Sequence, residues 1–129
     1  MTNSVNPAAL QRAAEMVLEQ AKQQGATASE AGVSHSKGLS VTVRQGDVET
    51  LEYNNDTSLG LTVYFGDSKA SASTSDLSEQ AIKDAVTAAC GIAKHTEEDA
   101  CAGLADKALM ATDFPDLSTY HPWDVTAEQ

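Results

Sequence analysis

The stretch GDVETLEYNNDTSLGLTVYFGDSKASASTSDLS, residues 46–78, alternates apolar and polar residues and then changes to a helical pattern. In its clearest run, the odd positions are apolar and the even ones polar or aromatic: Leu59, Leu61, Val63 and Phe65 against Thr62 and Tyr64. A period of two is typical of a β-strand with one buried face. Turn residues at 54–56 and 66–68 interrupt the alternation, so the stretch predicts strands joined by short antiparallel hairpins.

The same alternation extends toward the amino terminus. Two further runs, Ala31–Val33–His35 and Leu39–Val41–Val43, are separated by turn signals at Lys37-Gly38 and followed by Gln45-Gly46-Asp47. The last run, residues 69–74, consists almost entirely of Ala, Ser and Thr, side chains small enough for a helix or another chain to approach closely. Together the runs predict a mostly antiparallel meander of about five strands.

Two amphipathic helices are expected on either side of the meander. The first begins at Asn6-Pro7, ends at Gly25, and has its apolar stripe at Leu10, Ala13, Ala14, Val17, Leu18 and Ala21. The second is capped by Ser78, ends near Lys94-His95, and has its stripe at Ile82, Ala85, Val86, Ala89, Ile92 and Ala93. The predicted fold class is α+β, with both helices on one sheet face, burying Val41, Leu61, Val63, Ile82 and Val86.

The carboxy-terminal part of the chain has a different character. A short helix is possible at 105–110, and the following residues contain Pro115 and Pro122 without a clear period. We therefore expect an α+β domain over residues 1–112 and an extended connector over 113–129. The final DVTAEQ resembles the capped start of another helix, which suggests a longer protein.

Composition excludes several classes of function. The chain has 8 Lys and Arg against 19 Asp and Glu, and its formal net charge of −11 repels nucleic-acid phosphates and anionic lipid. We find no apolar segment near the ~20 residues that a membrane span needs, and no signal-peptide pattern. Two cysteines, Cys90 and Cys101, are too few for a disulfide framework. A cytoplasmic location is the simplest expectation.

Candidate chemical groups are scattered. His35, His95 and His121 lack the spacing of a zinc-binding motif. Cys90 is expected to be buried in a helix, and no cation or helix start flanks either cysteine to activate it. Glu97, Glu98 and Asp99 could hold a cation but form a pattern typical of a solvated surface. The sequence therefore predicts no catalytic, cofactor-binding or metal-binding residue.

Several short segments carry a family resemblance. These are the RxGxVE turn at 44–49, GLTVY at 60–64, STSDLS at 73–78 and DxCAGLAD at 99–106, followed by DFPDLSTYHPWDV. In this order and spacing the chain, from about residue 13 to 124, resembles the amino-terminal region of the TldD/PmbA family of metallopeptidases. CAGLADK and DFPDL are more similar to its PmbA (TldE) branch.

The resemblance implies a heterodimeric, ATP-independent cytoplasmic peptidase that acts on unfolded or small peptides. It implies zinc in a TldD-like partner subunit, bound by a His-Glu helix motif that lies beyond the region represented here and that a PmbA-type subunit lacks. No catalytic or metal residue is carried over to this chain. The family name "modulator of DNA gyrase" gains no support from so acidic a sequence.

Three interpretations remain open from sequence. The first is a non-catalytic amino-terminal domain of a PmbA-type peptidase subunit. The second is a free-standing binding or assembly module with the family fold and no protease role. The third is an enzyme with an unrecognised carboxylate or cysteine site, which the lack of paired groups at reactive spacing disfavours.

Overall fold

The structure is a computed structural model and describes residues 6–123, 125 and 126. Its elements follow the order α1 (Pro7–Gln23), β1 (Ala28–Arg44), β2 (Asp47–Phe65), β3 (Ser68–Thr74), α2 (Glu79–Ala93) and a short 3-10 helix, η1 (Lys107–Leu109). The described residues divide into two compact units. We call 6–36 with 56–104 the compact body, and 37–55 with 105–126 the distal unit.

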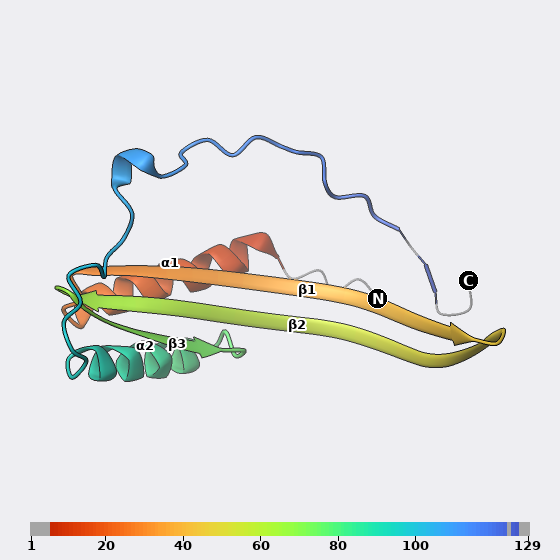
Figure 1. Cartoon of the computed structure of the whole chain (residues 1–129), viewed down its shortest axis with the longest axis horizontal. Coiled ribbons are helices and arrows are strands. Elements are labelled where there is room, and N and C mark those ends of the chain that lie inside the picture. Colours follow the sequence, from red (N-terminus) through yellow and green to blue (C-terminus); the bar gives the residue numbers. More distant parts are fainter. Residues whose placement is uncertain (1–5, 124, 127–129) are drawn as a thin grey trace. The chain divides into compact units, whose positions relative to one another are not determined.

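The strands form one sheet in the order β1-β2-β3 (Figure 1). β2 and β3 pair antiparallel in an unbroken register from Leu59–Thr74 to Phe65–Ser68. Positive φ angles occur where the hairpins reverse, at Gln45 and Gly46 and at Gly66. Two successive positive φ angles match a type I′ turn, and one at the first central position matches type II′.

The described residues contain three strands, which corrects the expected number of about five. The turn signals at Lys37-Gly38 and at 54–56 lie inside β1 and β2 respectively, with no positive φ angle. Gly and Asn permit a turn but do not require one, since an extended backbone satisfies its hydrogen bonds through continued pairing with a neighbouring strand. Each pair of expected strands is therefore one long strand.

Both ends of α1 agree with the sequence prediction. The Asn6 side chain accepts a hydrogen bond from the Ala8 N–H at 3.0 Å, and Pro7 is the first helical residue. At the other end Gly25 has φ +91°, and the Ala26 N–H donates to the Ala21 carbonyl at 3.1 Å. This is a Schellman motif, which lets the chain leave the helix and enter β1.

The ends of α2 also lie where the sequence places them. The Ser78 hydroxyl accepts from the Ala81 N–H, and the Asp76 carboxylate accepts from the Ser78 N–H at 2.8 Å. At the helix end, the Lys94 ammonium lies 5.2 Å from the centre of the Phe65 ring, a cation–π contact with the end of β2. α2 packs along β3 and against α1.

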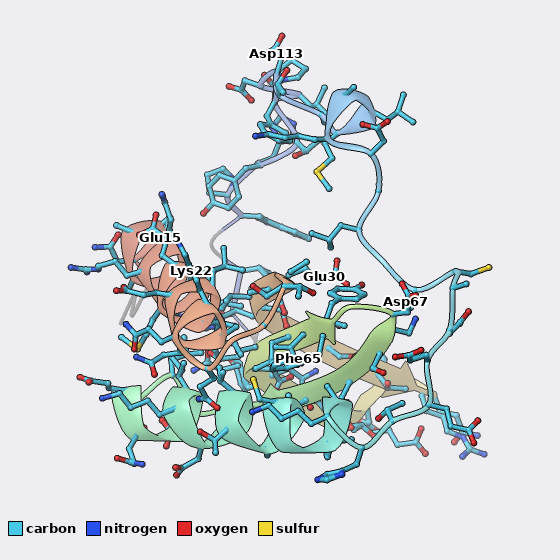
Figure 2. All side chains as sticks on the ribbon, turned by 90° about the vertical axis from the view of Figure 1, so that its left-hand side faces the viewer. Glu15, Lys22, Glu30, Phe65, Asp67 and Asp113 are labelled. Carbon is cyan, nitrogen blue, oxygen red and sulfur yellow. The ribbon has the colours of Figure 1, made fainter. Side chains whose placement is uncertain are left out.

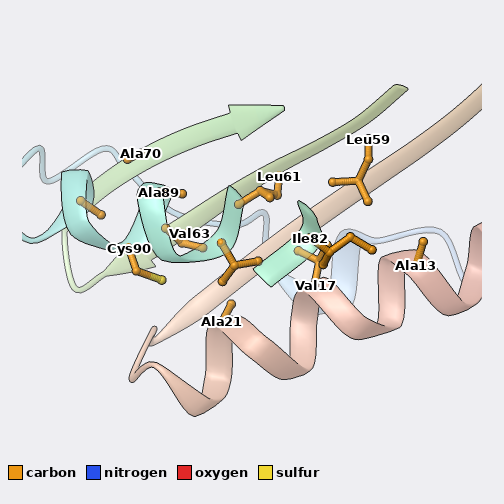
Figure 3. Packing of buried hydrophobic residues seen from close by; sticks show 12 residues of the cluster. Ala13, Val17, Ala21, Leu59, Leu61, Val63, Ala70, Ile82, Ala89 and Cys90 are labelled. Carbon is orange, nitrogen blue, oxygen red and sulfur yellow. The ribbon is translucent and has the colours of Figure 1, made fainter. Parts of the chain in front are cut away.

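The core lies where both helices pack on one face of the sheet (Figure 3). It comprises Ala13, Val17, Ala21, Leu59, Leu61, Val63, Ala70, Ile82, Val86, Ala89, Cys90 and Ala93. Four of the residues expected to be buried are among them, but Val41 is 39% exposed. Val41 belongs to the distal unit and not to the compact body that contains the core.

The distal unit contributes no residue to this core among those described. Of the exposed large hydrophobic residues, only Leu18, Ile92 and Leu104 belong to the compact body. The others are Val41, Val43, Val48, Leu51, Tyr53, Leu109, Met110, Phe114, Leu117, Tyr120 and Trp123. Exposed apolar surface is therefore concentrated in the distal unit, which is typical of an interaction surface. The expected division at residue 112 stays a prediction.

Candidate functional site

One concave surface lies on the sheet face opposite the helices. It is an open hollow of about 430 Å³ in the compact body, lined by Glu30, Ala31, Gly32, Gly60, Leu61, Thr62, Ser71 and Ala72. Glu30 lies on the side of the strands away from α2 (Figure 2). The even positions of β2 face this hollow, because they alternate with the core residues Leu59, Leu61 and Val63. Since these even positions are Gly60 and Thr62, the floor consists of glycine and small side chains.

Two polar pairs cross this open face. The Tyr64 hydroxyl donates to a carboxylate oxygen of Glu30 at 3.0 Å, and the hydroxyls of Thr62 and Ser71 lie 2.9 Å apart. Burial first, and then the hydrogen bond to Glu30 and its negative charge, raise the pKa of Tyr64. The phenol therefore stays protonated and acts as a donor. The sequence places Tyr64 on this face, but it contains no signal that pairs it with Glu30, 34 positions away.

The polar side chains of the hollow bond one another. A nucleophile needs an adjacent base, and the two hydroxyls bond each other instead of a histidine. The one carboxylate bonds a phenol whose pKa is raised, so no second acid or base completes an acid–base pair. The hollow is suited to contact with another chain through small polar side chains.

The three histidines lie on different elements. His35 is in β1, with Nδ1 3.1 Å from the Thr57 hydroxyl. Its Nε2 is buried and has no hydrogen-bond partner in the described structure. His95 follows α2, where its backbone N–H donates to the Ile92 carbonyl, and the exposed His121 lies after η1. The structure therefore does not bring the histidines together as a ligand set.

Neither cysteine lies in an environment that would activate its thiol. Cys90 is buried in α2 as expected, and burial raises the pKa of its thiol despite the opposing effect of Lys94. Cys101 is exposed, and its backbone N–H donates to the Asp99 carboxylate at 2.9 Å. A raised pKa lowers the thiolate fraction, so Cys90 is suited to packing rather than to attack on a substrate.

A metal centre does not fit the described residues. Within 6–123, 125 and 126, no three His, Cys, Asp or Glu side chains lie close enough to hold an ion. The acidic residues Glu97, Glu98 and Asp99 are exposed, and the Asp99 backbone N–H donates to the Asp67 carbonyl. A zinc ion of the kind implied by the family resemblance finds no ligand set here.

One observation bears on membranes. None of the helices in the described residues is long and apolar enough to span a bilayer.

Comparison with known sequences identifies close relatives. Residues 29–93 match the sequence profile of PmbA/TldA metallopeptidase domain 1. The chain is 50% identical over 120 residues to the metalloprotease PmbA homolog of Haemophilus influenzae, and 48% identical over 122 residues to the metalloprotease PmbA of Escherichia coli O157:H7. Each alignment covers 93% of this chain and 26% of the relative. The chain thus spans about a quarter of the length of these relatives.

Solved structures show the same fold. A putative modulator of DNA gyrase from Bacteroides thetaiotaomicron superposes with a TM-score of 0.74 over 81% of this chain and 24% of its own, at 19% identity. TldE from Thermococcus kodakarensis superposes with a TM-score of 0.62 over 68% of this chain and 20% of its own, at 15% identity. From the sequence profile and the two relatives, the chain belongs to the PmbA/TldD metallopeptidase family and contains its amino-terminal domain.

Proposed function

We propose that this chain is the non-catalytic amino-terminal domain of a PmbA-type subunit of a zinc metallopeptidase that processes unfolded peptides. The zinc belongs to a TldD-like partner subunit, and the assembly works in the cytoplasm. The carrying observation is the combination of family membership with a described region that brings no three metal ligands together.

The partner is supported by where the apolar surface lies. Large hydrophobic side chains are exposed over the distal unit, while the compact body buries most of its own. Exposed apolar surface on this scale is costly in an isolated domain and is typical of contact with other protein. In the proposed assembly this domain helps to form the wall of the chamber that admits peptides. The net charge of −11 argues against direct contact with nucleic acid or an anionic membrane.

The proposal is tested in a full-length chimera, in which this chain replaces the matching region of the H. influenzae relative. The chimera and a version without residues 1–112 are each mixed with the TldD-like subunit. Size-exclusion chromatography, peptidase assay and zinc content of the partner are then measured. We expect the deletion to weaken pairing or turnover while the partner keeps its zinc. Equal pairing and turnover with and without residues 1–112 would show that the domain is dispensable.

A further inference from the structure

The free edge of β3 has unpaired backbone groups in a defined pattern. β3 is the last strand of the sheet, and Phe65 and Ser68 face each other across a two-residue turn. The residues flanking such a turn exchange both of their backbone hydrogen bonds, and bonded and non-bonded pairs then alternate along the ladder. The N–H and C=O groups of Lys69, Ser71 and Ser73 therefore point away from β2. No other part of the described chain supplies backbone partners for these three residues.

This edge lacks most of the features that prevent strand addition. Natural edge strands are commonly protected by proline, by bulges or by several charged residues. β3 has no proline, its register with β2 is unbroken, and its one charged residue is Lys69, near one end. Ala70 and Ala72 face the helices, and Ser71 lines the hollow on the open face. The side chains of β3 itself are small enough for another strand to approach its edge closely.

Helix α2 provides an apolar surface below the same edge. Thr87 faces α1, because the Gln24 amide donates to its hydroxyl at 3.0 Å. At 3.6 residues per turn, Ala85 and Ile92 lie on the opposite side of the helix. Since α2 packs along β3, that side lies below the free edge of the strand. Ile92 is 57% exposed on that side of the helix. The small residues Ala81 and Ala88 lie on the same side and extend this apolar surface along α2.

The edge is complementary to itself. Around Ser71 the strand reads Lys-Ala-Ser-Ala-Ser, so an antiparallel pairing centred on Ser71 places alanines opposite alanines and Lys69 opposite Ser73 of the second copy. The pairing also brings Lys69 toward the end of the other strand that is followed by Asp76 and Glu79, which is favourable in charge. A surface that matches itself about a two-fold axis is what a symmetric dimer requires.

We propose that two copies of this chain associate through the β3 edges, forming a continuous six-stranded sheet with the two α2 helices packed side by side below it. The strand is ~24 Å long and the helix ~22 Å, so the interface buries on the order of 500 Å² per copy. That is below the ~800 Å² per partner of a standard stable interface. The dimer is therefore expected to be weak, and high salt strengthens it by screening the repulsion of two acidic chains. This inference does not depend on the proposed peptidase function.

The test uses charge substitution at the two-fold axis, followed by sedimentation velocity of the whole 129-residue chain over a wide range of concentration. Ser71→Lys and Ser71→Glu each place like charges opposite each other, so each variant alone is expected to be monomeric. An equimolar mixture of the two is expected to dimerise again. Ser58→Lys, an exposed serine of β2, is the matched control and keeps the dimer. Ile92→Glu is expected to weaken the dimer as well, because it places charge where the two α2 helices pack against each other.

Recovery in the mixture separates pairing from misfolding, since two unfolded variants do not rescue each other. Circular dichroism of each variant confirms that the Ser71 substitutions leave the fold intact. The proposal is overturned if the unmodified chain stays monomeric at all concentrations and salt levels. It is equally overturned if it dimerises without response to Ser71 charge, which would assign the contact to the exposed residues of the distal unit. Amide hydrogen exchange of β3 provides a further check. If the β3 amides are protected from exchange only when a TldD-like subunit is added, the edge binds that partner instead of a second copy.

Discussion

Tyr64 donates a 3.0 Å hydrogen bond to Glu30 and is only 6% exposed, although it lies on the sheet face that no helix covers. The contact joins β2 to β1 across the open face. The buried phenol keeps its hydroxyl satisfied by this carboxylate. The open face is thus ordered by specific polar contacts and is not an unstructured surface.

Replacing Tyr64 with Phe is expected to lower the free energy of unfolding by about 1 kcal/mol, because the bond to the Glu30 carboxylate is lost. It also changes the response to alkali. The pKa of Tyr64 is raised in the folded protein, so the unfolded state loses its proton first, near pH ~10, and stability declines above that pH. Urea unfolding between neutral and alkaline pH should show a shallower decline for Tyr64→Phe. Tyr53→Phe, at an exposed position, should match the unmodified chain.

Two isoleucines of α2 test the position of the core. Ile82 is fully buried, whereas Ile92, less than three turns further along, is more than half exposed. We expect Ile82→Ala to destabilise the compact body by about 2–5 kcal/mol, since it leaves a cavity between helix and sheet. Ile92→Ala should change stability by less than about 0.5 kcal/mol in dilute solution. Equal losses in thermal unfolding would show that the helix is rotated from the orientation described.

The turn before α2 gives the protein a response to acid. Hydrogen bonds from Ser78, with its backbone N–H first, lower the pKa of Asp76. A lowered folded-state pKa stabilises the protein above the ordinary value near pH ~4, and that contribution is lost as the pH falls toward the folded-state value. Asp76→Asn should therefore reduce the loss of melting temperature between pH ~7 and pH ~3. Asp56→Asn, in β2, is the control; if it flattened the profile as much, the effect would not be specific to this turn.

Local sequence signals predicted the helices and the true hairpin turns well. Asn6, Gly25 and Ser78 act through bonds to residues two to four positions away, so their roles are visible in short windows of sequence. The turn at Gln45-Gly46 requires positive φ angles, and that at Gly66 does too. Because only a few residue types meet such local requirements, these positions can be recognised in the sequence.

Other features depend on distant parts of the chain and were not predictable in this way. Whether Asn54-Asn55 turns or stays extended depends on the neighbouring strand, and Val41 is exposed although it has the same alternating pattern as the buried strand residues. The bond between Tyr64 and Glu30 depends on strand register, which alternation alone does not determine. For the candidate site, the sequence did not reveal the hollow or the contact between His35 and Thr57, because both depend on how the strands pair.

Metal binding by the isolated chain is expected to be weak and nonspecific. The described residues offer no cluster of three ligands, so zinc should associate no more tightly than with any acidic protein of similar charge. Elemental analysis after dialysis against a weak chelator measures this directly. One zinc per chain, retained after dialysis and lost in a His35→Gln, His95→Gln or His121→Gln variant, would contradict the prediction.

The account's central claim is that this domain supplies contacts and no catalytic group. Its most direct test is peptide turnover by the chimeric subunit assembled with its TldD-like partner, with His35, His95 and His121 each replaced by Gln. We expect turnover per assembled pair to equal that of the unmodified chimera, because these histidines lie on separate elements and the described residues hold no cluster of three ligands. His35 does lie 3.1 Å from the Thr57 hydroxyl, but its other ring nitrogen is buried, so the His35→Gln variant is the most demanding of the three. Loss of turnover by two orders of magnitude or more in a variant that still folds and pairs would place catalytic chemistry in this domain and contradict the claim.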